Sequence, residues 1–303
     1  MAILGAHQSI VGGYHKAVER AHLCGADCVQ LFTKNNNQWA SKDVKPEEAR
    51  RFREALERLG VAHPIAHDSY LINLASPNPR LWRKSVDAFV AELRRAEALG
   101  IPYVVTHPGA YTTGSEEGGL RNVVRALDEI HVQCRGLQAR CLLETTAGQG
   151  TSLGWRFEQL ARILDGVEEP DRLGFCFDTC HVFAAGYDLV TKKGYATTMT
   201  AFDRLLGLER IKAFHLNDSR RERGSRVDRH EHIGRGRLAV AAFRLLLADR
   251  RFRHVPMYLE TPKGEKDGVD WDVINLRVLR ACASFAGRRA PENSTIDPPV
   301  APR

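Results

Sequence analysis

The sequence has no long hydrophobic run and no cysteine pattern of the kind that defines a membrane protein or a disulfide-rich protein. No window approaches the ~18 consecutive apolar residues that a membrane-spanning helix requires. The seven cysteines are an odd number, and no two of them form a C-x-x-C pair. These absences argue against a membrane span and a disulfide framework, and they predict small, buried cysteines in a reducing compartment.

The first ten residues, MAILGAHQSI, lack the charged start and the long apolar segment of a signal peptide. We therefore expect a cytoplasmic protein. Acidic residues are fewer than basic ones, 37 against 44, and the net charge is +7. A basic excess suits a polyanionic partner such as nucleic acid. A solubilising, arginine-rich surface explains the same charge equally well.

Short apolar segments alternate with longer segments of helical period along the 303 residues. The apolar runs are continuous, as in parallel strands that are covered on both faces. We expect strands over residues 2–6, 27–32, 62–66, 103–106, 140–143, 174–177, 211–214 and 256–259. We expect helices over residues 46–59, 79–99, 155–164, 201–207, 240–250 and 270–285.

This alternation predicts a closed (β/α)8 TIM barrel in a single domain, for which a chain of ~250 residues or more is sufficient. An open, doubly wound sheet is the alternative. The barrel domain is expected to span residues 1–286. Residues 287–303 contain several prolines and no apolar period, so we expect a disordered tail there.

Six consecutive predicted strands are each followed by a histidine or a carboxylate. In chain order these residues are His67, His107, Glu144, Asp178, His215 and Glu260. The carboxyl ends of the strands of an α/β barrel meet at one mouth, where active sites lie. So many such groups in one cavity would leave unpaired charge unless a cation lay among them.

Three further metal-competent residues accompany this set. His181 follows Asp178 at i+3 in DTCH, and Asp228 and His230 are spaced i, i+2 in VDRH. The nine residues comprise five histidines, two aspartates and two glutamates, which is too many for one tetrahedral site. They suit a cluster of two or three zinc ions, because imidazole favours zinc and carboxylates can bridge.

Each of these signals has a plainer interpretation when it is taken alone. A single histidine at a strand end is more often structural than metal-bound, and only the joint pattern favours ligation. His7 ends the first strand and is either an outer partner of the ligands or structural. Cys176 and Cys180 flank Asp178 and could ligate zinc, but core packing is the better interpretation for Cys176. The glycine-rich segment 148–154 lacks the context of a dinucleotide fingerprint, and it predicts a tight loop that admits a ligand or a plain turn.

Several segments together resemble the endonuclease IV family of abasic-site endonucleases over roughly residues 2–284. The most specific segments are DTCHVFAAGYDL and GSRVDRHEHIG. The others are GAHQSIVGGY, LFTKNNNQW, HDSYLINLASP, THPGAY, LETTAGQGTSLG, FHLNDS and YLETP. The resemblance implies a (β/α)8 barrel and a zinc-dependent hydrolase of the deoxyribonuclease IV (phage-T4-induced) type, acting in base excision repair.

The resemblance implies three zinc ions held by the nine residues. His67, His107 and Glu144 would hold one ion. Glu144 would bridge to a second, which Asp178, His215 and Glu260 complete. His181, Asp228 and His230 would hold the third. With Glu144 and Glu260 as catalytic ligands, a zinc-bound hydroxide would attack the phosphorus 5′ to an abasic nucleotide, leaving a 3′-hydroxyl and a 5′-deoxyribose phosphate. Cleaning of blocked 3′ ends is also implied.

The resemblance further implies double-stranded DNA with an abasic site as the partner of a monomeric enzyme. Tyr70 and Leu71 would fill the vacated stack, although residues 70–72 could instead pack the top of the barrel. Lys34, Asn35 and Gln38 would contact the DNA backbone. Asn37 occupies the position where some members of the family carry a wedging arginine. Arg226 lies in a basic run, with Arg220, Arg221 and Arg223, that either contacts phosphates or is a solvated loop.

Two other functions remain open from the sequence. Glu144, Asp178, His215 and Glu260 also match the single-metal set of sugar isomerases and epimerases of the xylose-isomerase-like group. That function leaves five ligands and the basic charge unexplained. A DNA-lesion-binding protein without catalysis is the second alternative, but such a protein has no need of a complete ligand set.

Overall fold

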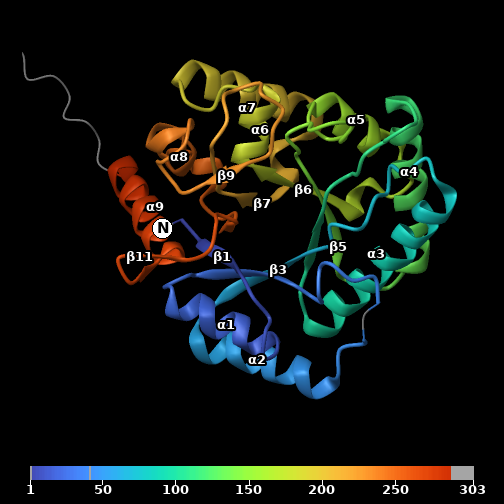
Figure 1. Cartoon of the computed structure of the whole chain (residues 1–303), viewed down its shortest axis with the longest axis horizontal. Coiled ribbons are helices and arrows are strands. Elements are labelled where there is room, and N and C mark those ends of the chain that lie inside the picture. Colours follow the sequence, from blue (N-terminus) through green and yellow to red (C-terminus); the bar gives the residue numbers. More distant parts are fainter. Residues whose placement is uncertain (1, 41, 288–303) are drawn as a thin grey trace, which may run out of the picture.

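The chain folds into a closed barrel of eight parallel strands surrounded by helices (Figure 1). The computed structural model describes residues 2–40 and 42–287. Around the barrel the strands follow the order β1-β10-β7-β6-β5-β4-β3-β2. They are β1 (Leu4–Gln8), β2 (Cys28–Phe32), β3 (Ala62–His67), β4 (Tyr103–Thr106), β5 (Arg140–Glu144), β6 (Leu173–Asp178), β7 (Ile211–His215) and β10 (Met257–Leu259). The predicted (β/α)8 architecture is confirmed, and the open-sheet alternative is wrong because β1 pairs with both β2 and β10.

The helices form the outer layer of the molecule. They are α1 (Tyr14–Leu23), α2 (Pro46–Leu59), α3 (Pro79–Leu99), α4 (Glu116–Gln133), α5 (Phe157–Gly166), α6 (Thr179–Ala185), α7 (Lys192–Leu206), α8 (Ala239–Ala248) and α9 (Trp271–Gly287). Single 3-10 turns lie at η1 (Pro170–Arg172), η2 (Leu208–Arg210) and η3 (Arg250–Phe252). The expected tail over residues 287–303 lies outside the described residues from residue 288 onward.

Strong local signals explain why two predicted helices match the structure at both ends. Pro46 begins α2, and Gly60 ends it in the left-handed region with φ of 65°. The Asn78 side chain caps α3 by accepting hydrogen bonds from two main-chain N–H groups of the first turn. At the other end of α3, Gly100 takes φ of 76°. These signals lie within a few residues of the helix ends that they define, so the ends can be predicted from the local sequence.

Three helices were not predicted, and a fourth was predicted too short. Two consecutive glycines, Gly118 and Gly119, weaken the signal at the start of α4. Helix α6 has only seven residues and begins immediately after β6, which masks its period. The predicted helix over residues 201–207 is the second half of α7, whose first half contains Gly194 and several threonines. Helix α1 lacks a side-chain cap at Gly13.

Apolar side chains fill two layers. Inside the barrel lie Cys28, Ile65, Val105, Leu142, Cys176, Ala213 and Tyr258. The larger layer lies between the barrel and the helices, where Phe52, Phe89 and Phe202 are fully buried. All seven cysteines are buried and free, as the odd count predicted. Among the described helices, none has the length and apolar character that crossing a bilayer requires.

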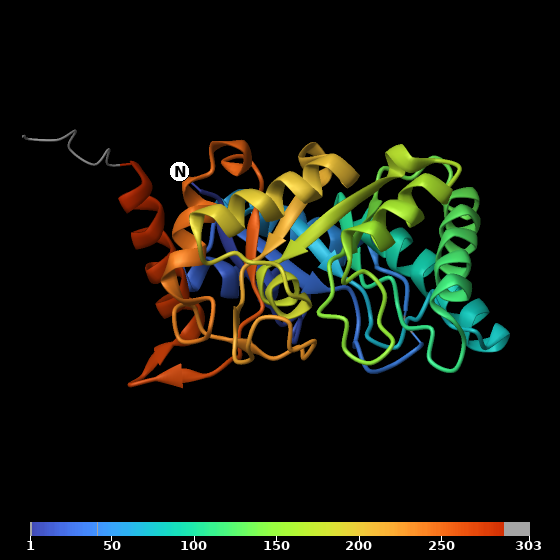
Figure 2. The ribbon, with the colours of Figure 1, turned by 90° about the horizontal axis from the view of Figure 1, so that it is seen from above.

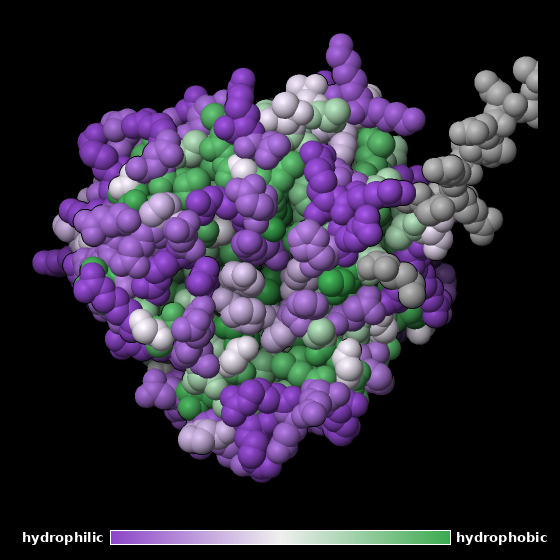
Figure 3. All heavy atoms as spheres, turned by 180° about the vertical axis from the view of Figure 1, so that it is seen from behind, coloured by the Kyte–Doolittle hydropathy of each residue, from purple (hydrophilic) through white to green (hydrophobic). Residues whose placement is uncertain are grey.

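The two ends of the barrel differ in what they carry. The long loops that follow the strands gather on one side of the molecule (Figure 2). Two small hairpins lie among these loops: β8 (Asp218–Ser219) pairs with β9 (His230–Glu231), and β11 (Glu265–Lys266) pairs with β12 (Val269–Asp270). The opposite end exposes hydrophobic residues between hydrophilic ones (Figure 3). The loop side is therefore where the strand-end residues meet.

Candidate metal centre

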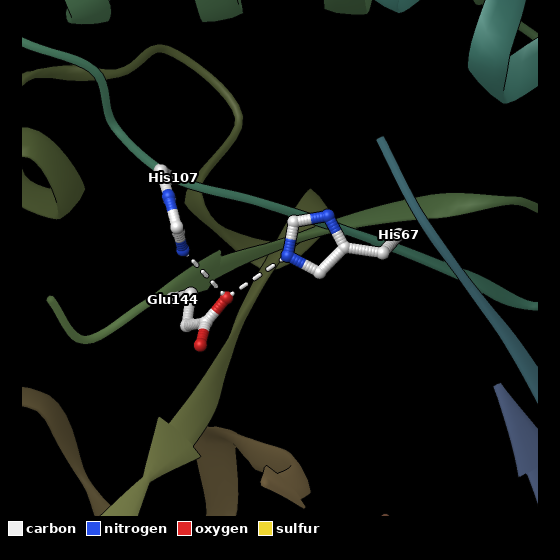
Figure 4. Close-up of side chains that lie close together, drawn as sticks. All are labelled: His67, His107 and Glu144. Carbon is white, nitrogen blue, oxygen red and sulfur yellow. Dashed lines mark hydrogen bonds and ion pairs between the residues drawn. The ribbon is translucent and has the colours of Figure 1, made fainter. Parts of the chain in front are cut away.

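His67, His107 and Glu144 converge at the carboxyl ends of β3, β4 and β5. The Nε2 atom of His67 lies 3.1 Å from Oε2 of Glu144, and the Nε2 atom of His107 lies 3.0 Å from the same oxygen (Figure 4). Neighbouring parallel strands pair in register here, since His67 aligns with Val105 and Thr106 aligns with Leu143. Two imidazoles from adjacent strands therefore face one carboxylate oxygen, which is a donor arrangement that suits one cation.

A second group shares Glu144 with the first. His215 is completely buried, and its Nδ1 atom lies 2.9 Å from Oε1 of Glu144, 3.2 Å from Oε2 of Glu260 and 3.8 Å from Oδ2 of Asp178. One oxygen of Glu144 thus faces the first group and the other faces the second. The two oxygens of this carboxylate are therefore directed at two different groups of donors.

A third group is assembled from α6 and the β8–β9 hairpin. The Nε2 atom of His181 lies 3.1 Å from Oδ2 of Asp228, and the Nε2 atom of His230 lies 3.3 Å from Oδ1. The two ring nitrogens lie 3.4 Å apart. The Cys180 thiol lies close to Asp228 and His230, and it approaches the Arg229 carbonyl at 3.7 Å. All nine residues that the sequence singled out therefore lie in one continuous cluster.

The hydrogen bonds of the outer ring nitrogens fix which nitrogen of each imidazole is free to bind a metal. Nδ1 of His67 lies 3.0 Å from the Asp68 carbonyl, and Nδ1 of His181 lies 2.9 Å from the Thr145 carbonyl. A carbonyl only accepts, so each Nδ1 carries the proton and each Nε2 presents a lone pair to the cluster. His215 is reversed, because Oε1 of Gln30 lies 2.7 Å from its Nε2 and leaves Nδ1 free.

Two buried amides that the sequence analysis did not single out hold the carboxylates in place. The Gln30 amide donates to Oε1 of Glu260 at 2.5 Å. The Asn217 amide donates to Oδ2 of Asp178 at 2.7 Å, and its carbonyl oxygen accepts the Glu260 N–H at 2.9 Å. A polar Gln30 inside the apolar run CVQLF was a usable signal in the sequence. His7 lies 2.9 Å from the Gln30 amide, which makes it an outer partner of the cluster.

The electrostatics of the cluster favour positive charge at its centre. Burial alone would raise the pKa of Glu144, yet His215 and His107 hold that pKa well below its usual value. Burial likewise opposes ionisation of Glu260, and the His215 imidazole nevertheless lowers its pKa to about 2. Burial disfavours protonation of His181, but Asp178 and Asp228 raise its pKa well above the usual value. Ionised, buried carboxylates with inward-facing imidazole nitrogens therefore fit a cluster of divalent cations.

A cavity of about 330 Å³ opens beside the cluster. His107, His181 and Asp228 line one side of it, and Tyr70 and Gly148 line other parts. The segment 148–154 therefore forms a wall of this cavity. A second, larger cavity of about 670 Å³ belongs to the opposite end, where apolar residues such as Ile65 and Val255 and charged residues such as Lys212 line it. None of its residues belongs to a potential metal-binding group in the described part of the chain.

The side chains expected to contact DNA take up different positions. Tyr70 is 65% exposed, with its ring centre 5.7 Å from the Phe32 ring centre, whereas Ile72 is buried. Ile72 therefore packs against the top of the barrel, whereas Tyr70 does not. Leu71 is half-buried. The Arg226 guanidinium lies 4.3 Å from the Trp155 ring centre, and its Nε donates to the Gly148 carbonyl at 2.9 Å.

The loop after β2 combines exposed amides with a buried ammonium. Asn35, Asn37 and Gln38 are exposed, and the Asn35 side chain accepts the Asn37 N–H at 2.9 Å. The Lys34 side chain is only 8% exposed, and its ammonium donates to main-chain carbonyls of its own loop. The structure thus brings the three amides to the surface and turns Lys34 inward.

Comparison with known proteins places this arrangement in a family. Residues 18–282 match the family model described as "Xylose isomerase-like TIM barrel". A curated relative from Chloroflexus aurantiacus, "Probable endonuclease 4", is 51% identical over 286 residues, which cover 94% of this chain and 100% of the relative. The chain belongs to the endonuclease IV family. The predicted family resemblance is confirmed.

Solved structures agree with membership of the endonuclease IV family. Endonuclease IV from Thermus thermophilus superposes with a TM-score of 0.80 at 38% identity, covering 93% of this chain and 99% of that chain. A D-tagatose 3-epimerase-like protein superposes with a TM-score of 0.70 at 18% identity, covering 93% and 98%. The second likeness shows the shared barrel fold alone.

Proposed function

We propose that this protein is a zinc-dependent endonuclease that hydrolyses the DNA phosphodiester 5′ to an abasic site in base excision repair. Two curated relatives named "Probable endonuclease 4" are each 51% identical to this chain, and the matches cover 100% and 98% of their own length. The observation that carries the proposal is the convergence of nine histidine, aspartate and glutamate residues in one cluster, with the fully buried Glu144 shared between two of its groups. A single-metal isomerase has no use for the third group of His181, Asp228 and His230.

The residues divide into three proposed zinc sites. His67, His107 and Glu144 hold the first ion. Glu144, Asp178, His215 and Glu260 hold the second. His181, Asp228 and His230 would hold the third, as their mutual distances allow. Zinc, when bound, supplies Lewis-acid stabilisation of phosphoryl oxygens and a nucleophilic water near neutral pH. Glu144 and Glu260 orient this chemistry through carboxylates whose low pKa keeps them ionised.

The protein's own side chains contribute to the mechanism by orienting the abasic nucleotide and by excluding water. The abasic nucleotide enters the cavity of about 330 Å³ beside the cluster, where its phosphate reaches the inward-facing imidazoles. An abasic nucleotide lacks a base to unstack, so extruding it costs less than extruding a paired one. Tyr70, exposed at the rim of that cavity, fills the space left in the DNA stack. The expected products are a 3′-hydroxyl and a 5′-deoxyribose phosphate.

The decisive test is a cleavage assay on a duplex that contains one tetrahydrofuran abasic analogue. We expect a single cut 5′ to the analogue, with a 3′-hydroxyl, and loss of cutting after prolonged chelation that zinc restores. Metal analysis should give about three zinc ions per chain. One manganese or magnesium ion per chain, together with ketose epimerisation and no cutting, would establish the isomerase alternative.

Further proposals follow from the same site. The rim is open enough for a blocked 3′ end, so we propose that the enzyme also cleans 3′ termini. We propose that it acts as a monomer in the cytoplasm. Sedimentation at working concentration tests the monomer. Release of phosphoglycolate from a 3′-phosphoglycolate terminus, which leaves a 3′-hydroxyl, tests the cleaning of 3′ ends.

A further inference from the structure

A buried network of charged side chains lies at the root of the loop after β2, away from the metal centre. Glu92 lies on the inner side of α3 with a side-chain exposure of 1%, and Arg95 of the same helix has 4%. Nη2 of Arg95 lies 2.8 Å from Oε2 of Glu92. Burying such charges costs several kcal/mol unless they are well paired, so this network demands an explanation.

Thr33, the first residue after β2, is tied into this network. Its hydroxyl donates to Oε2 of Glu92 and accepts from Nε of Arg95 at 2.9 Å. Its carbonyl accepts from the Tyr14 hydroxyl at 2.8 Å. The point at which the chain leaves the barrel is therefore fixed from both α1 and α3.

Lys34 closes the loop from inside. Its ammonium donates to the carbonyls of Asn35, at 3.2 Å, and Gln38, and it lies 3.9 Å from Oε1 of Glu92. An ammonium group has three donors, and the carbonyls of the loop already take two of them. The loop of residues 34–38 thus curls around a cation that Glu92 balances, and Asn35, Asn37 and Gln38 project outward.

The same loop contacts the turn that carries Tyr70. The Ser69 hydroxyl donates to the Asn36 carbonyl at 2.5 Å. The Phe32 ring, at the end of β2, lies with its centre 5.7 Å from the Tyr70 ring centre. A continuous chain of contacts therefore runs from Glu92 through Lys34 and residues 34–38 to Tyr70.

We propose that Glu92, Lys34 and Ser69 are positioning residues that hold the loop of residues 34–38 and the Tyr70 side chain in their DNA-binding geometry before DNA arrives. Lys34 acts on DNA through the loop, not through a phosphate contact. Fixing a loop in advance lowers the ordering cost of binding, which raises affinity without adding a contact. The inference rests on the proposed function, because it requires abasic DNA as the ligand.

The salt dependence of binding separates a positioning lysine from one that contacts phosphate. Each neutralised phosphate contributes a slope of about −0.9 to the plot of log affinity against log salt concentration. We expect Lys34→Ala to weaken binding to tetrahydrofuran duplex by about tenfold, since it removes loop hydrogen bonds, with an unchanged slope. A slope that falls by about 0.9 in magnitude, or an unchanged affinity, would overturn the proposal.

Lys212→Ala is the matched control. Its ammonium also donates to a main-chain carbonyl, that of Glu209 at 2.7 Å, but it lines the cavity at the opposite end of the barrel. Affinity and slope should both stay at wild-type values. Wild-type cleavage of abasic DNA is established first, so a failure of the proposed function is seen before any variant is compared.

Two further variants test the network where no DNA contact is possible. Glu92→Gln should reproduce the Lys34→Ala loss with the wild-type slope, although Glu92 is buried. Ser69→Ala should lower the preference for abasic over intact duplex by about fivefold through one lost hydrogen bond, with zinc content unchanged. This second variant removes one buried hydroxyl and leaves the buried charges intact, so it tests the link even if Glu92→Gln fails to fold. An unchanged preference in Ser69→Ala would refute the link to Tyr70.

Discussion

Gln30 and His215 form a buried pair in which the Gln30 side-chain oxygen lies 2.7 Å from Nε2 of the imidazole. The amide nitrogen of the same side chain donates to Oε1 of Glu260 at 2.5 Å. One fully buried glutamine thus fixes the tautomer of one proposed zinc ligand and the orientation of another. Such outer partners commonly contribute 10- to 100-fold to metal affinity.

Replacing Gln30 by alanine should therefore loosen the second zinc site more than the others. We expect about one of three zinc ions to be lost first during competition with a chelator, at a concentration about tenfold lower than for the wild type. Timed metal analysis during dialysis measures this. Asn122→Ala, which removes an amide that donates to the Ser76 carbonyl on the outer layer, is the control. Simultaneous loss of all three ions from Gln30→Ala would contradict the assignment.

Glu260→Gln should abolish cleavage while leaving binding to abasic DNA largely intact. The substitution keeps the shape of the side chain but removes the negative charge that faces His215. A loss of at least ~10³-fold in rate is expected if this carboxylate supports the reacting metals. Single-turnover cleavage and gel-shift binding measure the two properties separately. Retained cutting by a variant with full zinc content would refute the role of Glu260.

Tyr70→Ala should weaken recognition of the lesion without changing zinc content. The ring is largely exposed and packs edge-on to Phe32 and at a tilt to His67, so its removal leaves the cluster of donors in place. We expect binding to abasic duplex to weaken by about 1–3 kcal/mol, the usual contribution of a base-stacking aromatic. Tyr70→Phe should keep most of the affinity. A parallel fall in zinc content would mean that Tyr70 supports the metal centre instead.

Arg226→Ala tests whether the basic run after β7 contacts phosphate. The guanidinium of the exposed Arg226 lies over Trp155 and donates to the carbonyl of Gly148, which lines the cavity of about 330 Å³. If it neutralises one phosphate, the slope of log affinity against log salt should fall by about 0.9 in magnitude. Arg162→Ala, on the outer helix α5, should leave the slope unchanged. Equal slopes for wild type and Arg226→Ala would remove Arg226 from the interface.

His131 should make the stability of the protein sensitive to acid. It is 3% exposed on α4, and neither ring nitrogen has a hydrogen-bond partner among the described residues. Burial and, after it, the Arg172 charge lower its pKa to about 4, although the Glu169 and Asp128 charges oppose that shift. In the unfolded chain the pKa is about 6.5. The stabilising effect of a neutral His131 is therefore complete above pH 6.5 and is lost as the pH falls towards 4.

The variant His131→Leu removes this titration. Relative to wild type, its free energy of unfolding should rise by about 1–2 kcal/mol between pH 7 and pH 5. Urea unfolding at both pH values provides the comparison, and the difference at pH 7 corrects for the altered packing. A difference that does not depend on pH would show that His131 keeps an ordinary pKa in the fold.

Much of the site could be predicted because parallel strands deliver their last residues to one rim. His67, Glu144 and Asp178 are each the final residue of a strand in the structure, so a correct strand assignment already places them together. The group of His181, Asp228 and His230 could not be placed by a strand assignment alone. Asp228 and His230 reach His181 only because β9 pairs with β8, with His230 opposite Ser219. The local periodicity of the sequence does not predict that pairing.

The sequence alone predicted the barrel, the ends of α2 and α3 and the six residues at the strand ends, because each depends on short-range patterns or on a rule that all such barrels obey. Only the tertiary structure decided which nitrogen of each histidine faces the cluster and that Gln30 and Asn217 hold the carboxylates. It also decided that Lys34 points inward. These features depend on hydrogen bonds between segments far apart in the chain, and the direction of a side chain is settled by the partners that folding brings to it.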